Sequence, residues 1–268
     1  GFISYEAARA FEPAAKTRRA GGFPLLWFGI YDTPPEPFDP TQAPPPGAAL
    51  DEPEPEIGGR EYLAKIRRIK KAILEGETYQ ANFTFRARGG LAEGASTLGL
   101  FAHLFVNHPA PYAAYVNTGG VRIISNSPEL FLSRKGRTIS SEPMKGTTRR
   151  GLSGREDEEA KKWLAGDEKN LAENLMITDM VRNDLGRICE PGGVRTRSLF
   201  HVSTYDTLHQ MTSLVTGRLR KGVGIPEVMR AAFPAASITG APKIMATKII
   251  SGLEKSPRKV YTGAIGCA

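Results

Sequence analysis

The chain has 268 residues, of which 40% are hydrophobic and 24% charged, and this is the composition of an ordinary globular protein. No apolar run approaches the roughly 20 residues that cross a bilayer, and the two cysteines, Cys189 and Cys267, form no disulfide framework, so we expect no membrane association and a cytoplasmic location. The net charge of +8 is spread along the chain without a basic stripe, which argues against a nucleic-acid partner and is compatible with a small anionic substrate.

In chain order, residues 1–32 resemble a strand and loops that end in an apolar run, and we assign them to an N-terminal region. Residues 33–59 are dense in Pro, Gly and acidic residues, which predicts a linker or a long surface loop. Residues 60–268 have the pattern of one compact domain. Because both ends of the chain resemble interior strands, we expect a fragment that is truncated at both ends.

Within the compact domain, hydrophobic periodicity and turn residues predict helices and runs of strands. Asp167 is the expected N-cap of the second helix in the pair between residues 155 and 185. Because strands come in runs with helices between the runs, we predict an α+β fold of mainly antiparallel sheets packed together, with helices outside. The predicted elements are a helix at 60–77, a strand at 78–89, a strand meander at 109–146, two helices at 155–185, strands at 192–219, a helix from 225, a turn and helix at 233–255, and a strand at 259–266.

One lysine stands out in the segment 142–151, EPMKGTTRRG. Lys145 lies between a turn-forming Pro-Met and a Gly-Thr, with Arg149 and Arg150 just behind it. A free lysine has a pKa near 10.4, so a nucleophilic lysine needs desolvation or nearby cations to lower that value. On this peptide alone, an exposed loop lysine is the commoner case.

Two carboxylates are candidates for acid-base or metal chemistry. Glu129 follows Ser-Pro at a predicted strand start, where an acid is commonly just solvated. Glu173 lies among the apolar residues of LAENLMITDM, so we expect it to be paired, protonated or bound to a cation. An ion pair with Lys169, four residues earlier, is the alternative for Glu173.

Arg182 and Arg187 bracket the segment RNDLGR. Nine residues separate Glu173 from Arg182, which puts them on roughly opposite sides of a straight helix, so both serve one pocket only if the helix ends or bends near Arg182. The alternative is two surface arginines at a helix C-terminus, where the helix dipole favours them. Further on, ASITGAPK is a turn that opens a helix, and the amides of a helix N-terminus can bind a carboxylate.

Taken together and in order, six segments resemble the signature segments of the chorismate-utilising enzymes, a family that contains component I of anthranilate synthase, component I of aminodeoxychorismate synthase and the isochorismate synthases. The resemblance covers residues 60–268 and implies a chorismate-binding catalytic domain with the component I fold, incomplete at its C-terminus. The opening residues resemble the N-terminal part of bacterial aminodeoxychorismate synthase component I, of the shorter type often fused to a lyase domain. The six segments are ETYQANFTFR, SNSPELFL, PMKGTTRRG, DEKNLAENLMITDMVRNDLGR, FPAASITGAPK and VYTGAIG.

Within the family, the resemblance is closest to the aminodeoxychorismate synthases. Anthranilate and isochorismate synthases carry alanine where this chain has Lys145, and isochorismate synthases typically carry a catalytic lysine where it has Gln80. The implied function is conversion of chorismate and ammonia to 4-amino-4-deoxychorismate for para-aminobenzoate and folate synthesis, with ammonia supplied by a glutamine amidotransferase subunit or domain. The alternatives are anthranilate synthase component I and a non-catalytic relative that binds chorismate.

The resemblance also implies roles for individual residues. The amine of Lys145 attacks ring carbon C2 of chorismate while Glu129, the general acid, protonates the departing C4 hydroxyl, and ammonia then enters at C4 and expels the lysine. Glu173 matches a family ligand of Mg²⁺, the expected cofactor. The positions that match substrate contacts or supporting charges are Gln80, Thr147, Arg182, Arg187, Ser237, Gly240, Ala241 and Tyr261.

The chain departs from the family pattern at three points. Gln210 stands where many members have a histidine, with His209 one place earlier, and Asn170 stands where many have a second acid. The family's remaining Mg²⁺ carboxylates fall beyond the last matching segment. We therefore expect the chain to be inactive by itself.

Overall fold

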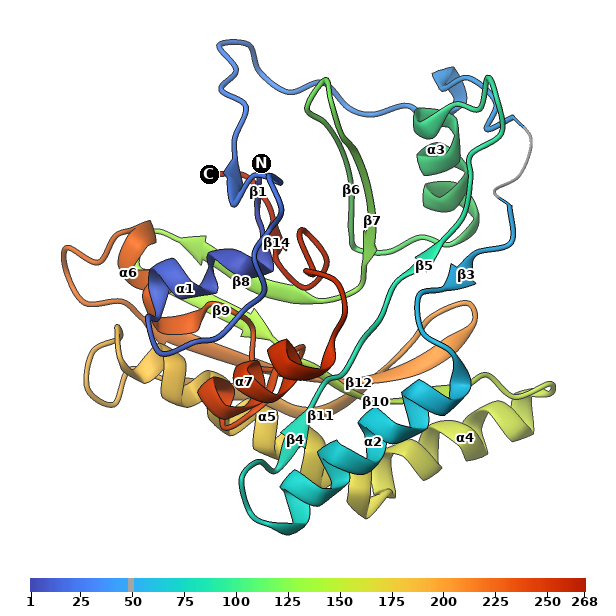
Figure 1. Ribbon diagram of the computed structural model, residues 1–268. Coiled ribbons are helices and arrows are strands. Elements are labelled where there is room, and N and C mark those ends of the chain that lie inside the picture. The colour runs from blue at the N-terminus through green and yellow to red at the C-terminus, as the bar shows by residue number, and fades with distance from the viewer. Residues whose placement is uncertain (48–50) are drawn as a thin grey trace.

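The computed structural model describes residues 1–47 and 51–268, so residues 48–50 of the predicted 33–59 segment lie outside the described residues. Its largest element is a five-stranded antiparallel sheet built around β12 (Leu208–Arg218). One edge of β12 pairs with β11 (Arg195–Thr204). The other edge of β12 pairs with β10 (Met144–Arg149) along its first half and with β9 (Thr138–Glu142) along its second half. On its far side, β9 pairs with β8 (Leu130–Lys135). The predicted α+β class with antiparallel sheets is confirmed (Figure 1).

Three helices pack against this sheet. They are α4 (Gly154–Gly166), α5 (Glu168–Gly186) and α6 (Ile225–Ala232). As predicted, Asp167 caps α5, and its side chain accepts a hydrogen bond of 3.0 Å from the amide of Asn170. The buried residues of α5 recur every three or four positions, which is one face of a helix; they are Asn174, Ile177, Thr178, Val181 and Leu185.

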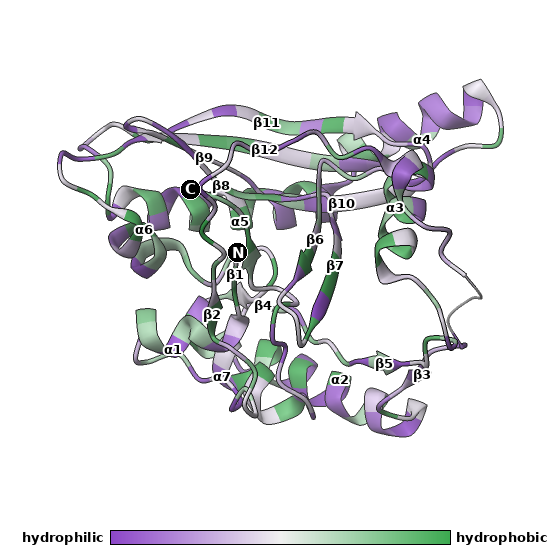
Figure 2. Cartoon of the chain, turned by 90° about the horizontal axis from the view of Figure 1, so that it is seen from above, coloured by the Kyte–Doolittle hydropathy of each residue, from purple (hydrophilic) through white to green (hydrophobic). Residues whose placement is uncertain are grey.

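The main hydrophobic core lies between the sheet and these helices. Ile139 of β9, Val215 of β12 and Leu185 of α5 are fully buried there, and Val228 of α6 closes one end. Figure 2 shows the sheet along one side of the molecule, α5 and α6 beneath it, and α2 (Gly59–Leu74) and α7 (Lys243–Leu253) on the opposite side. Burial of this apolar stripe fixes how α5 faces the sheet, and therefore which polar side chains it presents to β10.

The remaining strands are short and pair at a distance in sequence. β1 (Phe2–Ile3) lies between β2 (Leu26–Trp27) and β14 (Ala264–Ile265), β3 (Glu54–Pro55) pairs with β5 (Ala87–Arg88), and β4 (Gln80–Ala81) pairs with β13 (Gly240–Ala241). The short helices η1 (Tyr5–Ala7), α1 (Ala8–Phe11) and η2 (Pro40–Gln42) complete the N-terminal part. No helix in the described ranges is both long and apolar enough to span a membrane.

The hairpin of β6 (Tyr112–Asn117) and β7 (Arg122–Ser127) stands beside α3 (Thr97–Asn107), a helix that the predicted elements do not include (Figure 1). Phe38, from the Pro-rich segment, packs its ring against Phe101 and Phe105 of α3, with ring centroids 5.5 and 5.9 Å apart. Phe38 and η2 thus lie against α3, whereas β3, later in the same segment, pairs with β5.

Two predicted strands are much shorter than expected. Residues 78–89 are not one strand but the separate β4 and β5, because their partners, β13 and β3, belong to different sheets. In residues 259–266 only Ala264–Ile265 is a strand, since Lys259 and Thr262 have φ angles of 59° and 57°, which no strand accommodates.

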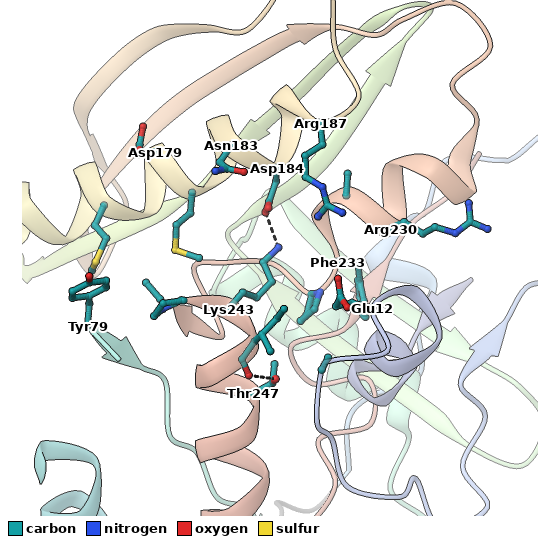
Figure 3. Close-up of a pocket in the computed structure, with 18 residues that line it drawn as sticks. Glu12, Tyr79, Asp179, Asn183, Asp184, Arg187, Arg230, Phe233, Lys243 and Thr247 are labelled. Carbon is teal, nitrogen blue, oxygen red and sulfur yellow. Dashed lines mark hydrogen bonds and ion pairs between the residues drawn. The ribbon is translucent and has the colours of Figure 1, made fainter. Parts of the chain in front are cut away.

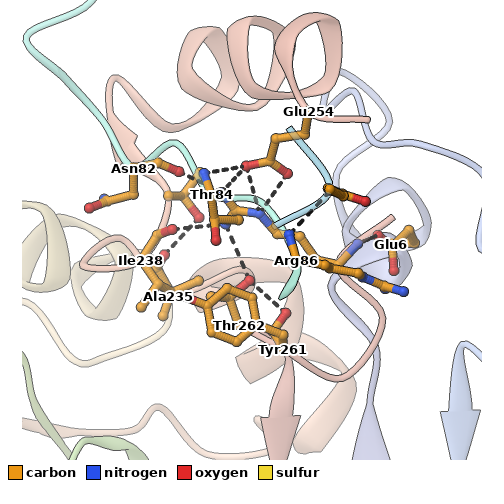
Figure 4. A network of polar contacts seen from close by, with 12 residues as sticks. Glu6, Asn82, Thr84, Arg86, Ala235, Ile238, Glu254, Tyr261 and Thr262 are labelled. Atoms are coloured by element: carbon orange, nitrogen blue, oxygen red, sulfur yellow. Dashed lines mark hydrogen bonds and ion pairs between the residues drawn. The ribbon is translucent and has the colours of Figure 1, made fainter. Parts of the chain in front are cut away.

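A network of polar contacts around the buried Arg258 joins the segments that surround this turn, and Figure 4 labels its partners Asn82, Ile238 and Glu254. Arg258 is 4% exposed and pairs with Glu254 at the end of α7, and its guanidinium also donates to the backbone oxygens of Ile238 and Asn82. The amides of Arg258 and Lys259 donate to the carboxylate of Glu6. Residues 4–8, 82, 238 and 254–259 are therefore held as one unit.

Candidate active site

Lys145 is part of the sheet rather than of an exposed loop. It lies on β10, half-buried, where the pairing of β10 with β12 shifts between Met144 and Thr147. The next residue, Gly146, has a φ of +99°, and a Cβ there would lie 3.2 Å from the Cβ of Asn170. Only glycine accommodates both this φ and this close approach, so Gly146 sets the irregular backbone that carries Lys145.

Burial lowers the pKa of the Lys145 amine, and the nearby charges of Glu129 and Glu173 oppose this shift. Of the two causes that the sequence left open, desolvation and nearby cations, burial is the one that lowers the pKa of Lys145. Arg150 is committed elsewhere, with two hydrogen bonds to Asp157 of 2.6 and 2.7 Å. Desolvation therefore raises the fraction of neutral, nucleophilic amine at a given pH.

Glu129 is not a solvated strand-end acid. Burial raises the pKa of its carboxyl, although hydrogen bonds from the hydroxyl of Ser237 and the backbone of Met144, and the charge of Lys145, act in the opposite direction. A raised pKa favours the protonated form, which is the form that a general acid needs. The structure thus brings Glu129, Lys145 and Ser237 into one site, although Glu129 and Ser237 are 108 residues apart in sequence.

Asn82 links these residues and was not among the predicted site residues. Its Oδ1 accepts a hydrogen bond of 3.2 Å from the amine of Lys145, and its Nδ2 donates to the backbone oxygen of Ser237 at 3.0 Å. Its own amide donates to Thr239 at 2.9 Å. Asn82 lies two residues after Gln80 in the segment YQANF, so a strand alternation that singles out Gln80 also indicates Asn82.

A second side-chain amide, that of Asn174, holds the backbone of Lys145 in place. It is 1% exposed on α5, and its Nδ2 donates to the backbone oxygens of Lys145 and Met211 at 3.1 and 3.4 Å. Its Oδ1 accepts a 2.5 Å hydrogen bond from the hydroxyl of Ser213. The signal in the sequence is a polar residue on the buried stripe of α5, next to the predicted site residue Glu173.

Gln80, Gly240 and Ala241 meet where β4 pairs with β13. A Cβ on Gly240 would lie 2.1 Å from the backbone oxygen of Gln80, so this contact requires glycine. The side-chain Oε1 of Gln80 is buried and has no hydrogen-bond partner among the described residues. A buried amide oxygen without a donor is costly, so it is suited to receive an N–H or O–H from a ligand.

Thr147 and Gln210 form a pair across β10 and β12, with 2.8 Å between Oγ1 and Oε1. Thr147 is exposed on this face. His209, the neighbour of Gln210, is 1% exposed and points elsewhere, with its Nε2 2.9 Å from Asp157 and its Nδ1 3.0 Å from the hydroxyl of Thr204. Because strand neighbours face opposite sides of a sheet, Gln210 shares the face of Thr147 and His209 does not.

Glu173 makes the ion pair that we named as the alternative, with 3.9 Å between its carboxylate and the amine of Lys169. The distance is long and Lys169 is exposed, so the pair is weak and leaves Glu173 able to bind a cation. In the described ranges no group of three or more His, Cys, Asp or Glu residues could hold a metal ion. Glu173 alone can supply one carboxylate, and Mg²⁺ is commonly bound by one or two carboxylates together with water and substrate oxygens.

Arg182 lies on the exposed surface of α5 and pairs with Asp179 at 2.9 Å. The helix continues beyond it to Gly186, so the end of the helix that we considered near Arg182 lies four residues later. Tyr261 is 62% exposed in the turn after α7. Neither side chain makes a hydrogen bond to Lys145 or Glu129 in the described structure.

Arg187 and Ala241 line a different space, a cavity of about 480 Å³ between the end of α5 and the start of α7 (Figure 3). Lys145, Glu129, Glu173 and Ser237 do not line it. Asp184 does, and it also borders a small pocket of about 20 Å³ next to Glu129 and Ser237, which has room for about one water molecule. The two spaces therefore meet at Asp184.

The chain adopts the fold of anthranilate synthase component I. It superposes with a TM-score of 0.83 on a crystal structure of anthranilate synthase component I from Streptococcus pneumoniae, at 23% identity, over 99% of this chain and 67% of that one. A structure of MenF, the menaquinone-specific isochorismate synthase from Escherichia coli, matches with a TM-score of 0.72 at 17% identity, over 85% of this chain and 51% of that one.

The chain belongs to the chorismate binding enzyme family, which matches residues 33–268. It is 42% identical to an aminodeoxychorismate synthase of Arabidopsis thaliana over 79% of this chain and 23% of the relative. It is 34% identical to anthranilate synthase component 1 of Methanothermobacter thermautotrophicus over 99% of this chain and 61% of the relative. The chain thus spans about a quarter of the first of these relatives and about three fifths of the second.

Proposed function

We propose that the protein carrying this chain is component I of an aminodeoxychorismate synthase, which converts chorismate and ammonia to 4-amino-4-deoxychorismate. The observation that carries this proposal is the pairing of two half-buried groups in one site, the amine of Lys145, whose pKa is lowered, and the carboxyl of Glu129, whose pKa is raised. Two titratable groups in one site whose pKa values are shifted in opposite directions are the usual sign of a nucleophile or base beside an acid.

The chemistry follows from these two groups. The neutral amine of Lys145 forms a bond to C2 of chorismate, the ring double bond shifts, and the C4–O bond breaks as Glu129 gives its proton to the departing hydroxyl, which leaves as water. Ammonia then forms a bond to C4, the double bond shifts back, and the C2–N bond to Lys145 breaks. The C2–N bond takes its electron pair to Lys145, which leaves as a neutral amine, and the new C4 ammonium gives a proton to the Glu129 carboxylate, so the sum is chorismate plus ammonia giving product plus water.

Other residues of the site have supporting roles in this proposal. Asn82 and Asn174 hold the amine and the backbone of Lys145, and the unpartnered Oε1 of Gln80 offers an acceptor to the substrate or to ammonia. Glu173 would supply a carboxylate to Mg²⁺, which when bound neutralises charge on the substrate. A cytoplasmic location and a glutamine amidotransferase that delivers ammonia belong to the same proposal.

Anthranilate synthase component I is the second candidate, because relatives of that name align with 99% of the chain. That reaction places ammonia at C2 and eliminates pyruvate, and it needs no covalent lysine. The half-buried position of Lys145 favours the first candidate, since an amine with a lowered pKa is what covalent catalysis uses and is costly otherwise.

Product identification separates the candidates. The protein carrying this sequence is incubated with chorismate, Mg²⁺ and an ammonium salt, and products are identified by mass for the wild type, Lys145→Ala and a control, Lys135→Ala, at an exposed site on β8. We expect a product that retains the enolpyruvyl group, made by wild type and control and lost in Lys145→Ala. Anthranilate and pyruvate from all three proteins would instead establish the second candidate.

A further inference from the structure

The cavity beside α7 has the size and lining of a separate ligand site. Its volume of about 480 Å³ lies within the range of about 300–1,000 Å³ in which proteins hold small molecules. Its apolar wall includes Met176 and Met180 of α5, Phe233 and Ile244. Methionine sulfur packs well against aromatic rings, so this wall suits a flat aromatic body.

Two charged groups of the cavity lining make no ion pair in the described structure, namely Arg187 and Glu12, whose Oε1 accepts a hydrogen bond of 3.1 Å from the amide of Ala14. Asp179 pairs with Arg182 at 2.9 Å, and Arg230 pairs with Glu227 at 3.1 Å. Figure 3 shows Arg230 extending away from the space, whereas Arg187 reaches toward it. The Arg187 guanidinium makes no hydrogen bond or ion pair to any described residue, so it is free to bind an anion.

Lys243 and Asp184 form the polar floor. The amine of Lys243 donates to Asp184 at 2.6 Å and to the backbone oxygen of Ala232 at 3.1 Å, which uses two of its three N–H groups. Both side chains are largely buried, with 17% and 15% exposure. The pair is balanced in charge, so the guanidinium of Arg187 and the carboxylate of Glu12 are the charged groups that remain for a ligand.

The start of α7 adds further donors. Residues 242–244 form part of the cavity wall, and no side chain caps this end of the helix. Among the described residues, the amides of 243–245 have no acceptor, as expected for the first turn of a helix. Together with Arg187 they favour a carboxylate over a neutral group.

We propose that this cavity binds a small aromatic monocarboxylate, with its ring against Met176 and Met180 and its carboxylate at Arg187. The unpaired guanidinium of Arg187 matches the negative charge of the carboxylate, and the apolar wall matches the ring. The proposal does not depend on the reaction at Lys145. It assigns Arg187 to a second site rather than to support of chorismate.

Methionine methyl groups report on the two sites separately. The whole chain is labelled with ¹³C-methyl methionine and titrated with 2-naphthoate, or with its neutral amide, 2-naphthamide. Met176 and Met180 line the cavity, Met144 precedes Lys145, and Met211 is fully buried in the core. We expect saturable shifts at Met176 and Met180 with 2-naphthoate, no shifts at Met144 and Met211, and at least tenfold weaker binding of the amide.

Two arginine variants, one at the cavity and one outside it, supply the matched control. Arg187→Gln removes the free guanidinium and should weaken 2-naphthoate binding about tenfold, the equivalent of about 1.4 kcal/mol. Arg155→Gln changes an exposed arginine of α4 that does not line the cavity and whose partner, Glu159, does not line it either, so the affinity should stay unchanged. Ile244→Trp, which places a larger side chain in the wall, should also weaken binding.

Three results would overturn the proposal. The first is a shift confined to Met144, which would place the ligand at the Lys145 site. The second is equal binding of 2-naphthoate and 2-naphthamide, and the third is equal affinity of the two arginine variants for 2-naphthoate. Absence of any saturable shift would do the same. None of these outcomes depends on whether chorismate is aminated, so this test can contradict the ligand site at Arg187 without contradicting the proposed reaction at Lys145.

Discussion

Asn82 and Lys145 are 63 residues apart in sequence, yet the side-chain oxygen of Asn82 accepts a hydrogen bond of 3.2 Å from the amine of Lys145. The same amide group donates to the backbone oxygen of Ser237, whose hydroxyl in turn donates to Glu129. One asparagine therefore sets the distance between the proposed nucleophile and the turn that holds the proposed acid.

The first prediction follows from this contact. Asn82→Asp replaces a neutral acceptor with a carboxylate beside the amine, and a nearby opposite charge favours the protonated form. The pKa of Lys145 should rise by about one unit, since such pairs shift pKa values by about 1–3 units. Titration of ¹³C-methylated lysines, or the pH dependence of kcat/KM, measures this change.

Asn82→Ala is the matched control, because it removes the hydrogen bond without adding charge. The activity of Asn82→Ala should fall. The pKa of Lys145, read from the pH profile, should stay well below the pKa that it has in Asn82→Asp. If the two variants have the same Lys145 pKa, Asn82 does not act on the amine in the way we describe.

The pH dependence of the reaction is the second prediction. Activity requires a neutral Lys145 and a protonated Glu129, so kcat/KM should rise and then fall with pH. Burial lowers the pKa of Lys145 from 10.5 and raises that of Glu129 from 4.5, so both limbs lie inside these two values. The measurement is a profile of kcat/KM over a wide pH range.

Glu129→Gln tests the assignment of the acid. Loss of a general acid should lower kcat by about 10²–10⁴-fold. The remaining activity should increase with pH through the pKa of Lys145 and show no falling limb, because Gln does not titrate. A variant profile that still falls at high pH would assign that limb to another group.

The third prediction concerns the proposed Mg²⁺ site. Glu173→Gln keeps the shape of the side chain and removes its charge, so the Mg²⁺ concentration that gives half-maximal activity should rise about tenfold or more. Lys169→Gln is the control, since it removes only the distant cation 3.9 Å from Glu173 and should leave this concentration unchanged or slightly lower. Equal Mg²⁺ dependence in wild type and Glu173→Gln would remove Glu173 from the metal site.

The fourth prediction concerns stability. Arg258→Met leaves the carboxylate of Glu254 buried without its partner and removes bonds to two backbone oxygens. Breaking a buried ion pair in this way typically costs about 3–5 kcal/mol of unfolding free energy. Arg155→Met breaks the exposed pair with Glu159 and should cost about 0.5 kcal/mol or less. Urea unfolding of both variants gives the comparison, and similar losses would mean that the Arg258 network contributes little.

Much of the local structure follows from the sequence. Asp167 caps α5 as predicted, because a capping side chain acts on amides only three residues away. The turns at Gly119, Ser127 and Gly136 separate β6, β7, β8 and β9 because turn residues act within four positions of the chain. The single strand predicted at 78–89 was wrong, since pairing partners far along the chain divide it into β4 and β5.

By itself, the sequence determined the family, the antiparallel α+β class and the lysine that marks the proposed reaction, since these are written in local patterns and residue identities. Only the tertiary structure decided that burial, and not Arg149 or Arg150, lowers the pKa of Lys145. It also brought in Asn82 and Asn174, and it placed Arg187 at a separate cavity. Desolvation, hydrogen-bond partners and cavities depend on which distant segments meet, and the packing of α5 and α7 against their neighbours decides that.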